Sequence, residues 1–456
     1  MNNEREICKL AFLVTGFPPN VSGVSLFNWE RAQWFSRQSN YQVAVFAPDF
    51  QNSRTKHSID TSNSIKNLTV ERYPSKPWLP YPLNYVPKIK ATNQINQKLR
   101  SHQPDIVVVT DVEQFFFLSA WQLPGYDYVQ EFKIPYIAEY HTDIYNFSAA
   151  YQGWQWLRNA AHLFRIPYYL YRNFDATLCS SIAAAESCRN LGIPNTATVP
   201  FLGIDISMYN PNRRNRQCLK PWLTDEEQNN KVILFLGRLG FEKRVDLLIS
   251  AFKKLQCKQL NCSLAIAGDG PIEVVNYLED LAKSIPNIHF LGFVEGEAKA
   301  NLMASCDIFC SPSPYETFGR TIVEAMASGI PVITVNSGAV SEYIVDGVNG
   351  HLVPPNNINK LVNSLAQALI ANNQTITQKA VQDANQLSIE RGCIHLNNYY
   401  QKLLKSHQNL FNFVLLYGYS KLNVKTGGYH RIRRSYSPRL DDFKLLAEPS
   451  FGTKWH

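Results

Sequence analysis

Two glutamates flank a stretch of backbone that suits a phosphorylated sugar. Glu316 and Glu324 stand eight positions apart in YETFGRTIVEAMASG, and a helix is predicted to begin near Gly319. The amides of Phe318, Gly319 and Arg320 are then unpaired at the positive end of that helix, where they can bind phosphate. The spacing predicts that Glu316 contacts sugar hydroxyls and Glu324 a ribose. For the pair alone, a capped helix with solvated carboxylates is the alternative.

A second loop supplies positive charge. In LGRLGFEKR, Arg238 and Lys243 follow a predicted strand and precede an amphipathic helix. Cations in this position can neutralise the charge that grows on a departing diphosphate. A basic loop is more often simply solvated, but this one is predicted to lie in the same cleft as the phosphate-binding amides. Gly268, in the strand-end sequence AGDGP, is predicted to make a tight turn beside the nucleotide.

The N-terminal half contributes a glycine and a histidine to the predicted cleft. The loop PPNVSGV follows the first predicted strand, and Gly23 would leave room for a donor phosphate or an acceptor near a helix start. His141 follows another strand, in EYHT, and is predicted to point into the cleft, although a lone histidine is more often structural. Glu342, in SEYI, is expected to be a surface helix residue or a further ribose contact.

The elements that position these loops alternate between strand and helix. Short apolar runs indicate buried parallel strands, and mixed patterns between them indicate helices. The predicted strands are 10–15, 43–47, 106–110, 136–139, 176–180, 198–200, 232–236, 263–267, 288–291, 308–311 and 331–335, and the predicted helices are 25–37, 89–101, 157–174, 245–255, 272–284, 297–305 and 320–328. The alternation predicts an α/β fold with two doubly wound domains whose sheet edges face a central cleft.

A polar stretch separates the two alternating halves. The expected organisation is an N-terminal Rossmann-like domain over 1–209, a linker over 210–230, a second Rossmann-like domain over 231–388, a helix over 389–406 and a tail over 407–456. The tail is aromatic and basic, and its sequence predicts no fold.

Composition restricts the class of protein. The 456 residues are 45% hydrophobic and 18% charged, with a net charge of +8, which is typical of a folded enzyme and suits phosphorylated ligands or an acidic membrane surface. No basic run or reader motif indicates nucleic acid. No apolar stretch reaches the roughly 18 residues that span a bilayer, and the start of the chain does not resemble a signal peptide. The nine cysteines match no zinc or redox spacing. We expect a cytoplasmic protein, soluble or peripheral on the inner face of a membrane.

Missing motifs also restrict the chemistry. No Asp-x-Asp pair ends a predicted strand, so no metal and no cofactor is expected, and cationic side chains with helix amides would hold the diphosphate. The absence of a G-x-G-x-x-G turn argues against an oxidoreductase, and hydrolase and P-loop motifs are absent too. A non-catalytic binder of nucleotide sugars is the remaining alternative, against which the set of Glu316, Glu324, Arg238 and Lys243 argues.

Together these motifs resemble the family 4 retaining glycosyltransferases of the GT-B fold. The resemblance rests on YETFGRTIVEAMASGIPVI and GRLGFEKRVDLLISAF, with AGDGP, SEYI, DGVNGHLV and PPNVSGV in support, and covers roughly residues 10–400. In the N-terminal half, SGV, YHTDIYNF, FDATLCSS and VPFLGIDISMYNP are similar to the lipid-modifying branch that includes sulfoquinovosyl-diacylglycerol synthases and phosphatidylinositol mannosyltransferases. The chain departs from that branch in YRNFDATLC, in the segment after His141 and in the tail from Leu410.

The loops and the resemblance together predict the residues that bind the nucleotide-sugar donor: Gly23, Arg238, Lys243, Gly268, Glu316, Phe318, Gly319 and Glu324. The resemblance implies an overlapping set at the reacting centre: His141, Glu316, Arg238 and Lys243. It further implies that the leaving phosphate assists the incoming hydroxyl on one face of the sugar, without a protein nucleophile, and that stabilisation of the diphosphate dominates catalysis. It also implies that helix 389–406 crosses back to the N-terminal domain and that closure of the domains excludes water.

The motifs fix neither the sugar nor the base, uridine or guanosine. As acceptor, a membrane lipid headgroup is favoured over a soluble sugar or a polysaccharide intermediate. Residues 81–100 mix aromatic, apolar and basic side chains and could lie on an anionic surface. The alternative for this segment is an amphipathic helix that covers the sheet.

Overall fold

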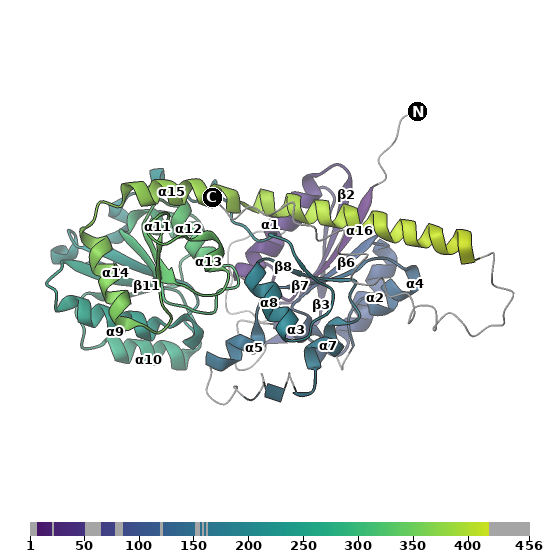
Figure 1. The fold of residues 1–456 in the computed structure, drawn as a ribbon, viewed down its shortest axis with the longest axis horizontal. Helices are drawn as coiled ribbons and strands as arrows, with labels where there is room; N and C mark the ends of the chain where they lie inside the picture. Colours follow the sequence, from purple (N-terminus) through teal and green to yellow (C-terminus); the bar gives the residue numbers. More distant parts are fainter. Residues whose placement is uncertain are drawn as a thin grey trace.

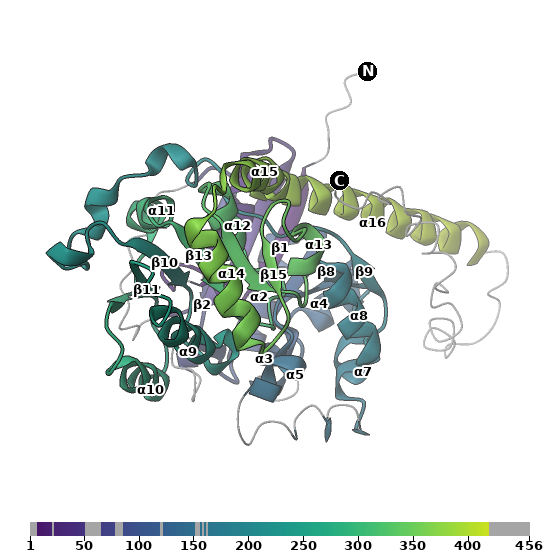
Figure 2. The same cartoon turned by 60° about the vertical axis from the view of Figure 1, so that its left-hand side comes forward.

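The computed structural model describes residues 7–20, 22–50, 65–77, 85–118, 122–150, 156, 159–160 and 163–418. Within these residues the chain forms two α/β halves side by side, and one long helix lies along the N-terminal half (Figure 1). Seen from a second direction, helices cover both faces of the sheet in the C-terminal half (Figure 2).

The first sheet has seven strands in the order β3-β2-β1-β6-β7-β8-β9, all parallel. They are β1 (Cys8–Leu13), β2 (Tyr41–Pro48), β3 (Leu68–Tyr73), β6 (Ile106–Thr110), β7 (Tyr136–Tyr140), β8 (Ala176–Cys179) and β9 (Thr196–Thr198). In β1, Leu10 and Phe12 pack on one face, whereas Ala11 and Leu13 pack on the other. Because both faces are buried, the strands appear in the sequence as continuous apolar runs.

Helices cover both faces of the first sheet. They are α1 (Gly23–Arg37), α2 (Ala91–His102), α3 (Val112–Leu118), α4 (Tyr126–Phe132), α5 (Ile144–Phe147), α7 (Ile166–Tyr171) and α8 (Ile182–Asn190). Helix α1 covers one face of the sheet together with the C-terminal helix. The core on the opposite face contains residues of α2, α3, α4, α7 and α8. A short antiparallel pair, β4 (Ser75–Pro77) and β5 (Tyr85–Pro87), forms a separate small sheet.

The second sheet has six parallel strands in the order β12-β11-β10-β13-β14-β15. They are β10 (Lys231–Leu236), β11 (Cys262–Ala267), β12 (Ile288–Gly292), β13 (Ile308–Ser311), β14 (Val332–Val335) and β15 (His351–Val353). One face is covered by α9 (Val245–Gln256), α10 (Ile272–Ala282) and α14 (Ile358–Ile370), and the other by α11 (Gly296–Ser305), α12 (Arg320–Ala327) and α15 (Gln374–Ala384). The chain direction across the sheet reverses beside β1 in the first half and beside β10 in the second, and ligands bind at such points in doubly wound folds.

The C-terminal helix α16 (Ile389–Gly418) packs on the N-terminal half. Leu396, Tyr400 and Leu403 join the core that contains α1, and Tyr400 stacks on Phe35 with ring centroids 5.8 Å apart. The helix continues to Gly418, beyond the predicted end at residue 406. Residues 419–456, most of the predicted tail, lie outside the described residues.

Three other expectations about the elements differ from the structure. β3 and β15 were not predicted, because β3 is only partly buried and contains charged residues, and β15 is three residues long. The strand predicted at 198–200 lies at Thr196–Thr198. Of the helix predicted at 157–174, the described residues are helical at 159–160, at 163 and in α7 over Ile166–Tyr171, with a turn at 164–165.

Segment 210–230, predicted as a linker, is packed on the C-terminal half. It forms short 3-10 turns, and two of them contact α11. Arg214 and Arg216 both bind the carboxylate of Asp307, at 2.7 and 2.8 Å. The segment is therefore anchored along its length, although its sequence shows no strand or helix pattern.

Two further findings concern the chain as a whole. No helix in the described part of the chain combines the length and hydropathy needed to cross a bilayer. All nine cysteines are free thiols and six of them are buried. Burial raises the pKa of Cys262 to about 11, which keeps that thiol protonated near neutral pH.

Candidate active site

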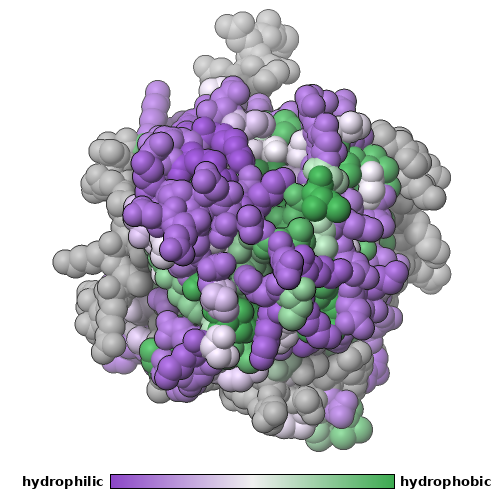
Figure 3. Space-filling model, turned by 90° about the vertical axis from the view of Figure 1, so that its left-hand side faces the viewer, coloured by the Kyte–Doolittle hydropathy of each residue, from purple (hydrophilic) through white to green (hydrophobic). Residues whose placement is uncertain are grey.

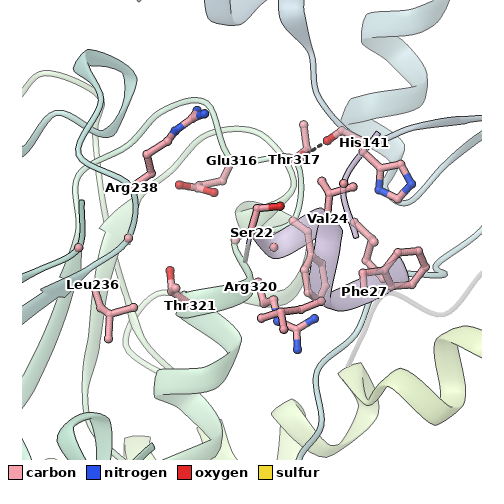
Figure 4. A pocket seen from close by; sticks show the side chains of 18 of the residues that line it. Ser22, Val24, Phe27, His141, Leu236, Arg238, Glu316, Thr317, Arg320 and Thr321 are labelled. Carbon is pink, nitrogen blue, oxygen red and sulfur yellow. Dashed lines mark hydrogen bonds between the residues drawn. The ribbon is translucent and has the colours of Figure 1, made fainter. Parts of the chain in front are cut away.

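The carboxyl edges of the two sheets face one another across a cavity of about 650 Å³. Its walls come from the loops after β1, β6 and β7 on one side and after β10, β11 and β13 on the other, and Figure 4 shows side chains from both sides. Among the described residues, every lysine and arginine that lines it comes from the C-terminal half: Arg238, Lys243, Lys299 and Arg320.

The loop after β10 brings the two predicted phosphate ligands to the cavity. Arg238 Nη2 lies 2.8 Å from Oε1 of Glu242, a buried carboxylate that holds the guanidinium in place. Lys243 Nζ lies 2.6 Å from Oε1 of Glu316, and both side chains remain partly exposed to the cavity. The lysine expected to bind diphosphate and the carboxylate expected to bind sugar are thus paired with each other.

The loop between β13 and α12 is fixed at its glycine. Gly319 has a φ of 76°, and a side chain there would come within 2.9 Å of the Ile322 side chain and of the Tyr343 hydroxyl. That hydroxyl, from the short helix α13 (Val340–Tyr343), donates to the carbonyl of Phe318 at 2.6 Å. The start of α12 is therefore held in a defined orientation beside the cavity, which Phe318, Gly319 and Arg320 line, and phosphate binding by their amides stays a prediction.

Glu324 lies beneath the cavity wall. It is fully buried, and its two oxygens lie 3.2 Å from Arg320 Nε and 2.6 Å from Lys299 Nζ. Lys299 and Arg320 line the cavity, whereas Glu324 does not. A contact between Glu324 and a ribose stays a prediction, and it would be made beside these two cations.

Arg320 was expected to contribute only its amide. Its guanidinium also binds Glu30 of α1, with 2.6 Å between Nη2 and Oε1, and so joins the phosphate-binding loop to the N-terminal half. Burial raises the pKa of Glu30, and the charge of Arg320 opposes that effect. No local pattern indicates this pair, because its members are 290 positions apart in the sequence.

The two other predicted glycines, Gly268 and Gly23, line the cavity for different reasons. Gly268 has a φ of 149°, and a side chain there would lie 1.8 Å from the carbonyl oxygen of Gly237, so glycine allows these two loops to touch. Gly23 is the first residue of α1, and a side chain there would meet no atom within 4 Å. Gly23 therefore borders open space at the start of a helix.

His141 follows β7 and also lines the cavity. Its ring packs against both Phe27 and Phe201, with centroids 5.4 Å from each, and its Nε2 is 3.1 Å from Oε2 of Glu139. Its carbonyl oxygen accepts a hydrogen bond of 2.8 Å from Thr317, which Figure 4 shows crossing from the C-terminal half.

Two acidic residues have roles that the motifs did not indicate. Glu342 caps helix α8 from the other half, since its carboxylate accepts from the amides of Ile182 and Ala183 at 3.0 and 2.8 Å. It lies in the short helix α13 and is partly exposed, as one of the two expectations had it, and it is not among the residues that line the cavity. Asp111 directly follows β6, lines the N-terminal side of the cavity and accepts from the Thr15 hydroxyl at 2.5 Å. An aspartate after an apolar strand was the available signal for this position.

Comparisons with known proteins agree with this architecture. The family models "Glycosyltransferase Family 4" and "Glycosyl transferases group 1" match residues 21–207 and 221–385. A GDP-mannose-dependent alpha-mannosyltransferase of Corynebacterium glutamicum is 28% identical over 352 residues, 76% of this chain and 76% of that protein. A GDP-mannose-dependent alpha-(1-6)-phosphatidylinositol dimannoside mannosyltransferase of Mycobacterium tuberculosis is 35% identical over 173 residues, 38% of this chain and 44% of that protein. The structure of HepE from Anabaena with UDP and glucose superposes with a TM-score of 0.64 at 21% identity, covering 87% of this chain and 100% of that one.

Two parallel sheets that face one another across the cavity, each within a matched glycosyltransferase domain, define a GT-B glycosyltransferase. The chain belongs to glycosyltransferase family 4, and it is an enzyme that uses a sugar nucleotide as donor.

Proposed function

We propose that the enzyme binds a nucleoside diphosphate sugar against its C-terminal half and transfers the sugar, with retention of configuration, to a hydroxyl of a membrane lipid headgroup. The convergence of Arg238, Lys243 and the start of α12 on one side of the cavity carries the proposal. Two cations and a helix terminus at one point are suited to a diphosphate. A thermal-shift screen with UDP, GDP and ADP tests it, because a ligand that binds the folded state raises its melting temperature. We expect one base to stabilise the native protein, and no shift with any of them would contradict the proposal.

Donor binding would rearrange the pair formed by Lys243 and Glu316. The diphosphate competes for the ammonium group of Lys243, which leaves the Glu316 carboxylate to accept hydrogen bonds from the sugar hydroxyls. The cations stabilise the leaving diphosphate, so we propose that transfer needs no divalent metal. The rate should then be the same with and without EDTA, and a loss that Mg²⁺ or Mn²⁺ restores would contradict this part.

Retention follows if the leaving diphosphate accepts the proton of the incoming hydroxyl on the same face of the sugar. Arg238, Lys243 and the start of α12 support this route, because they line one side of the cavity and would hold the leaving diphosphate beside the sugar. An NMR spectrum of the first product from an α-linked donor should show an α linkage. A β linkage would contradict retention.

An exposed aromatic surface supports a lipid acceptor. Its candidate residues are near one another in the sequence: Trp156, Leu163, Phe164 and Tyr169, with exposed fractions of 65%, 76%, 64% and 53%. Arg172 lies over the Tyr169 ring at 5.0 Å. The end of the C-terminal half shows hydrophilic side chains around a hydrophobic area near the middle of the face (Figure 3). Aromatic side chains interleaved with arginine suit the interface of an anionic membrane.

This surface lies close in the chain to the acceptor side of the cavity. Ile144 and Ser148 line the cavity, and Trp156 follows them closely in the sequence. The mycobacterial relative is named for a phosphatidylinositol dimannoside, which agrees with a lipid acceptor. We propose that the enzyme associates peripherally with the membrane that contains its acceptor.

The earlier candidate for membrane contact, residues 81–100, is less suitable. Residues 81–84 lie outside the described residues, and α2 buries Ala91, Ile95 and Leu99 in the core beside the sheet. The apolar side of this helix thus covers the sheet, as the alternative interpretation expected.

Flotation with vesicles of phosphatidylcholine and phosphatidylglycerol tests the aromatic surface. The variant Phe164→Ser/Tyr169→Ser should no longer float with the vesicles at low salt. The control Ile89→Ser removes an apolar side chain of similar exposure, 71%, from the other candidate segment, and should float like the native protein. Equal flotation of both variants and the native protein would contradict the proposed surface.

A further inference from the structure

Behind His141 lies a buried polar cluster that the reaction described so far does not use. Arg31 of α1, Glu139 of β7 and Tyr400 of α16 are fully buried. Glu139 contacts every other member: its Oε2 lies 2.5 Å from Arg31 Nη1 and 3.1 Å from His141 Nε2, and its Oε1 accepts from the Tyr400 hydroxyl at 3.2 Å. Segments far apart in the sequence therefore converge on one carboxylate.

This cluster is expected to contribute little to the stability of the fold. Removing a carboxylate and a guanidinium from water is costly unless the remaining polar atoms find partners. The Nε and Nη2 atoms of Arg31 have no hydrogen-bond partner among the described residues. The guanidinium lies 4.1 Å from the ring centre of Phe12 and 5.0 Å from that of Phe27, where an apolar side chain would also pack. The ion pair therefore points to a task other than stability.

The contact between Glu139 and Nε2 of His141 indicates what the cluster does. Burial raises the pKa of Glu139, but the charge of Arg31 and the bond to His141 outweigh burial and hold that pKa below its ordinary value. An ionised carboxylate only accepts hydrogen bonds, so Nε2 of His141 must carry the proton of this contact. In the neutral ring, Nδ1 is then an acceptor.

We propose that Glu139 is a positioning residue that fixes the tautomer of His141, so that Nδ1 accepts a hydrogen bond from a hydroxyl of the donor sugar. Arg31 keeps the carboxylate ionised, and Tyr400 orients it from the C-terminal helix. That helix thus takes part in the site although Tyr400 does not line the cavity. The inference rests on the proposed contact of His141 with the donor sugar.

The variant Arg31→Met/Glu139→Leu separates this task from a structural one. It removes both charges together, so no buried charge is left unpaired, and it should fold with at most the loss expected for two unpaired donors, His141 Nε2 and the Tyr400 hydroxyl. His141 loses the acceptor for its Nε2 proton, so kcat should fall about 10- to 100-fold. KM for the donor should change less, because the diphosphate contacts remain. A folded Leu variant with the native kcat would overturn the inference.

A second variant, with glutamine in place of Glu139, tests whether a hydrogen-bond acceptor alone restores kcat. Arg31→Met/Glu139→Gln keeps an amide oxygen that can accept from Nε2, so it should recover most of the kcat that the Leu variant loses. Failure of the Gln variant to exceed the Leu variant would overturn the role of the hydrogen bond.

The variant His141→Ala distinguishes this inference from the proposed function on which it rests. Loss of kcat in His141→Ala, with native kcat in the Leu variant, would mean that His141 acts without Glu139. Native kcat in His141→Ala would instead overturn the sugar contact itself.

Nitrogen-15 spectra of the native protein decide the tautomer even if a variant fails to fold. With histidine labelled and the His141 signals assigned from their absence in His141→Ala, the inference predicts a protonated Nε2 and an unprotonated Nδ1 at neutral pH. The opposite tautomer would overturn it.

Discussion

The two halves of the enzyme hold their charged side chains in different places. In the C-terminal half the cations face the cavity, as Arg238 and Lys243 do. In the N-terminal half no described lysine or arginine lines the cavity, and the pair of Arg31 with Glu139 is buried behind His141. Both halves have a parallel sheet with its carboxyl edge toward the cavity, so the loops, and not the fold, decide the chemistry. We infer that the diphosphate belongs to the C-terminal half and the hydroxyl-bearing acceptor to the N-terminal half.

The loop between β13 and α12, which is proposed to bind the donor, also contacts the N-terminal half. Thr317 and Arg320, on either side of Gly319, bond to the His141 carbonyl and to Glu30. Because the residues that hold the phosphate also contact the N-terminal half, binding of the donor and closure of the cavity should be coupled.

Glu316→Gln should produce the largest effect and should separate sugar chemistry from nucleotide binding. Transfer is expected to fall about 10²- to 10³-fold, because the sugar loses a charged acceptor. Binding of the nucleoside diphosphate alone should not weaken, since Lys243 loses its competing carboxylate. Calorimetry and initial rates measure both quantities, with the exposed Glu273→Gln as the matched control. A parallel loss of nucleotide binding would contradict this division.

Glu30→Gln tests the contact between the halves. It removes the charge that Arg320 binds on α1 but leaves the bond of Arg320 to Glu324. We expect kcat/KM to fall about tenfold, the value of a charge-assisted hydrogen bond, and small-angle scattering to show a more open molecule. The exposed Glu186→Gln should change neither quantity. An unchanged scattering profile in Glu30→Gln would argue against coupling through this pair.

Asp111→Asn examines the acceptor side. Asp111 lines the cavity from the N-terminal half, and its carboxylate can accept a hydrogen bond from a hydroxyl group of the acceptor substrate. Its loss of charge should raise KM for the acceptor about fivefold and leave KM for the donor unchanged. Steady-state kinetics with each substrate varied in turn measure the difference. A larger effect on the donor would reverse the assignment of the halves.

Glu113→Gln should change stability and not transfer. Burial raises the pKa of Glu113 to about 7, although bonds from its own backbone and from Tyr171 oppose the rise. A pKa that is higher in the folded state means that the protonated form stabilises the fold at low pH and that this stability is lost as pH rises through about 7. The native free energy of unfolding should therefore decline by about 2 kcal/mol more than that of Glu113→Gln between about pH 5 and pH 8. Parallel pH profiles from denaturant titrations would show that Glu113 is ionised throughout.

The sequence predicted the sheets well because their strands are buried on both faces. The run KVILFL and the run IVVVT are visible without any tertiary information. β3, with Glu71 and Arg72 in a half-exposed strand, lacks that pattern. Segment 210–230 lacks it as well, because its anchors are single arginines whose partner, Asp307, lies in another part of the chain.

The same limit applies to the site. Arg238, Lys243, Glu316 and Gly319 belong to local motifs, and the structure brings all of them to one cavity. Glu30, Glu139 and Glu342 acquire their partners only through the fold, at separations that no local pattern spans. Motifs therefore indicate the groups that meet the donor, whereas the residues that orient those groups become visible only in three dimensions.

Calorimetric titration of the preferred nucleoside diphosphate into native protein and into Lys243→Ala tests whether the loop after β10 binds the diphosphate. We expect the Kd for the diphosphate to rise about 10- to 100-fold in Lys243→Ala, because a charged contact to the diphosphate is lost. We expect no change in Lys283→Ala, which removes an exposed lysine from the same half. Equal affinity in Lys243→Ala and native protein would contradict the placement of the diphosphate at this loop.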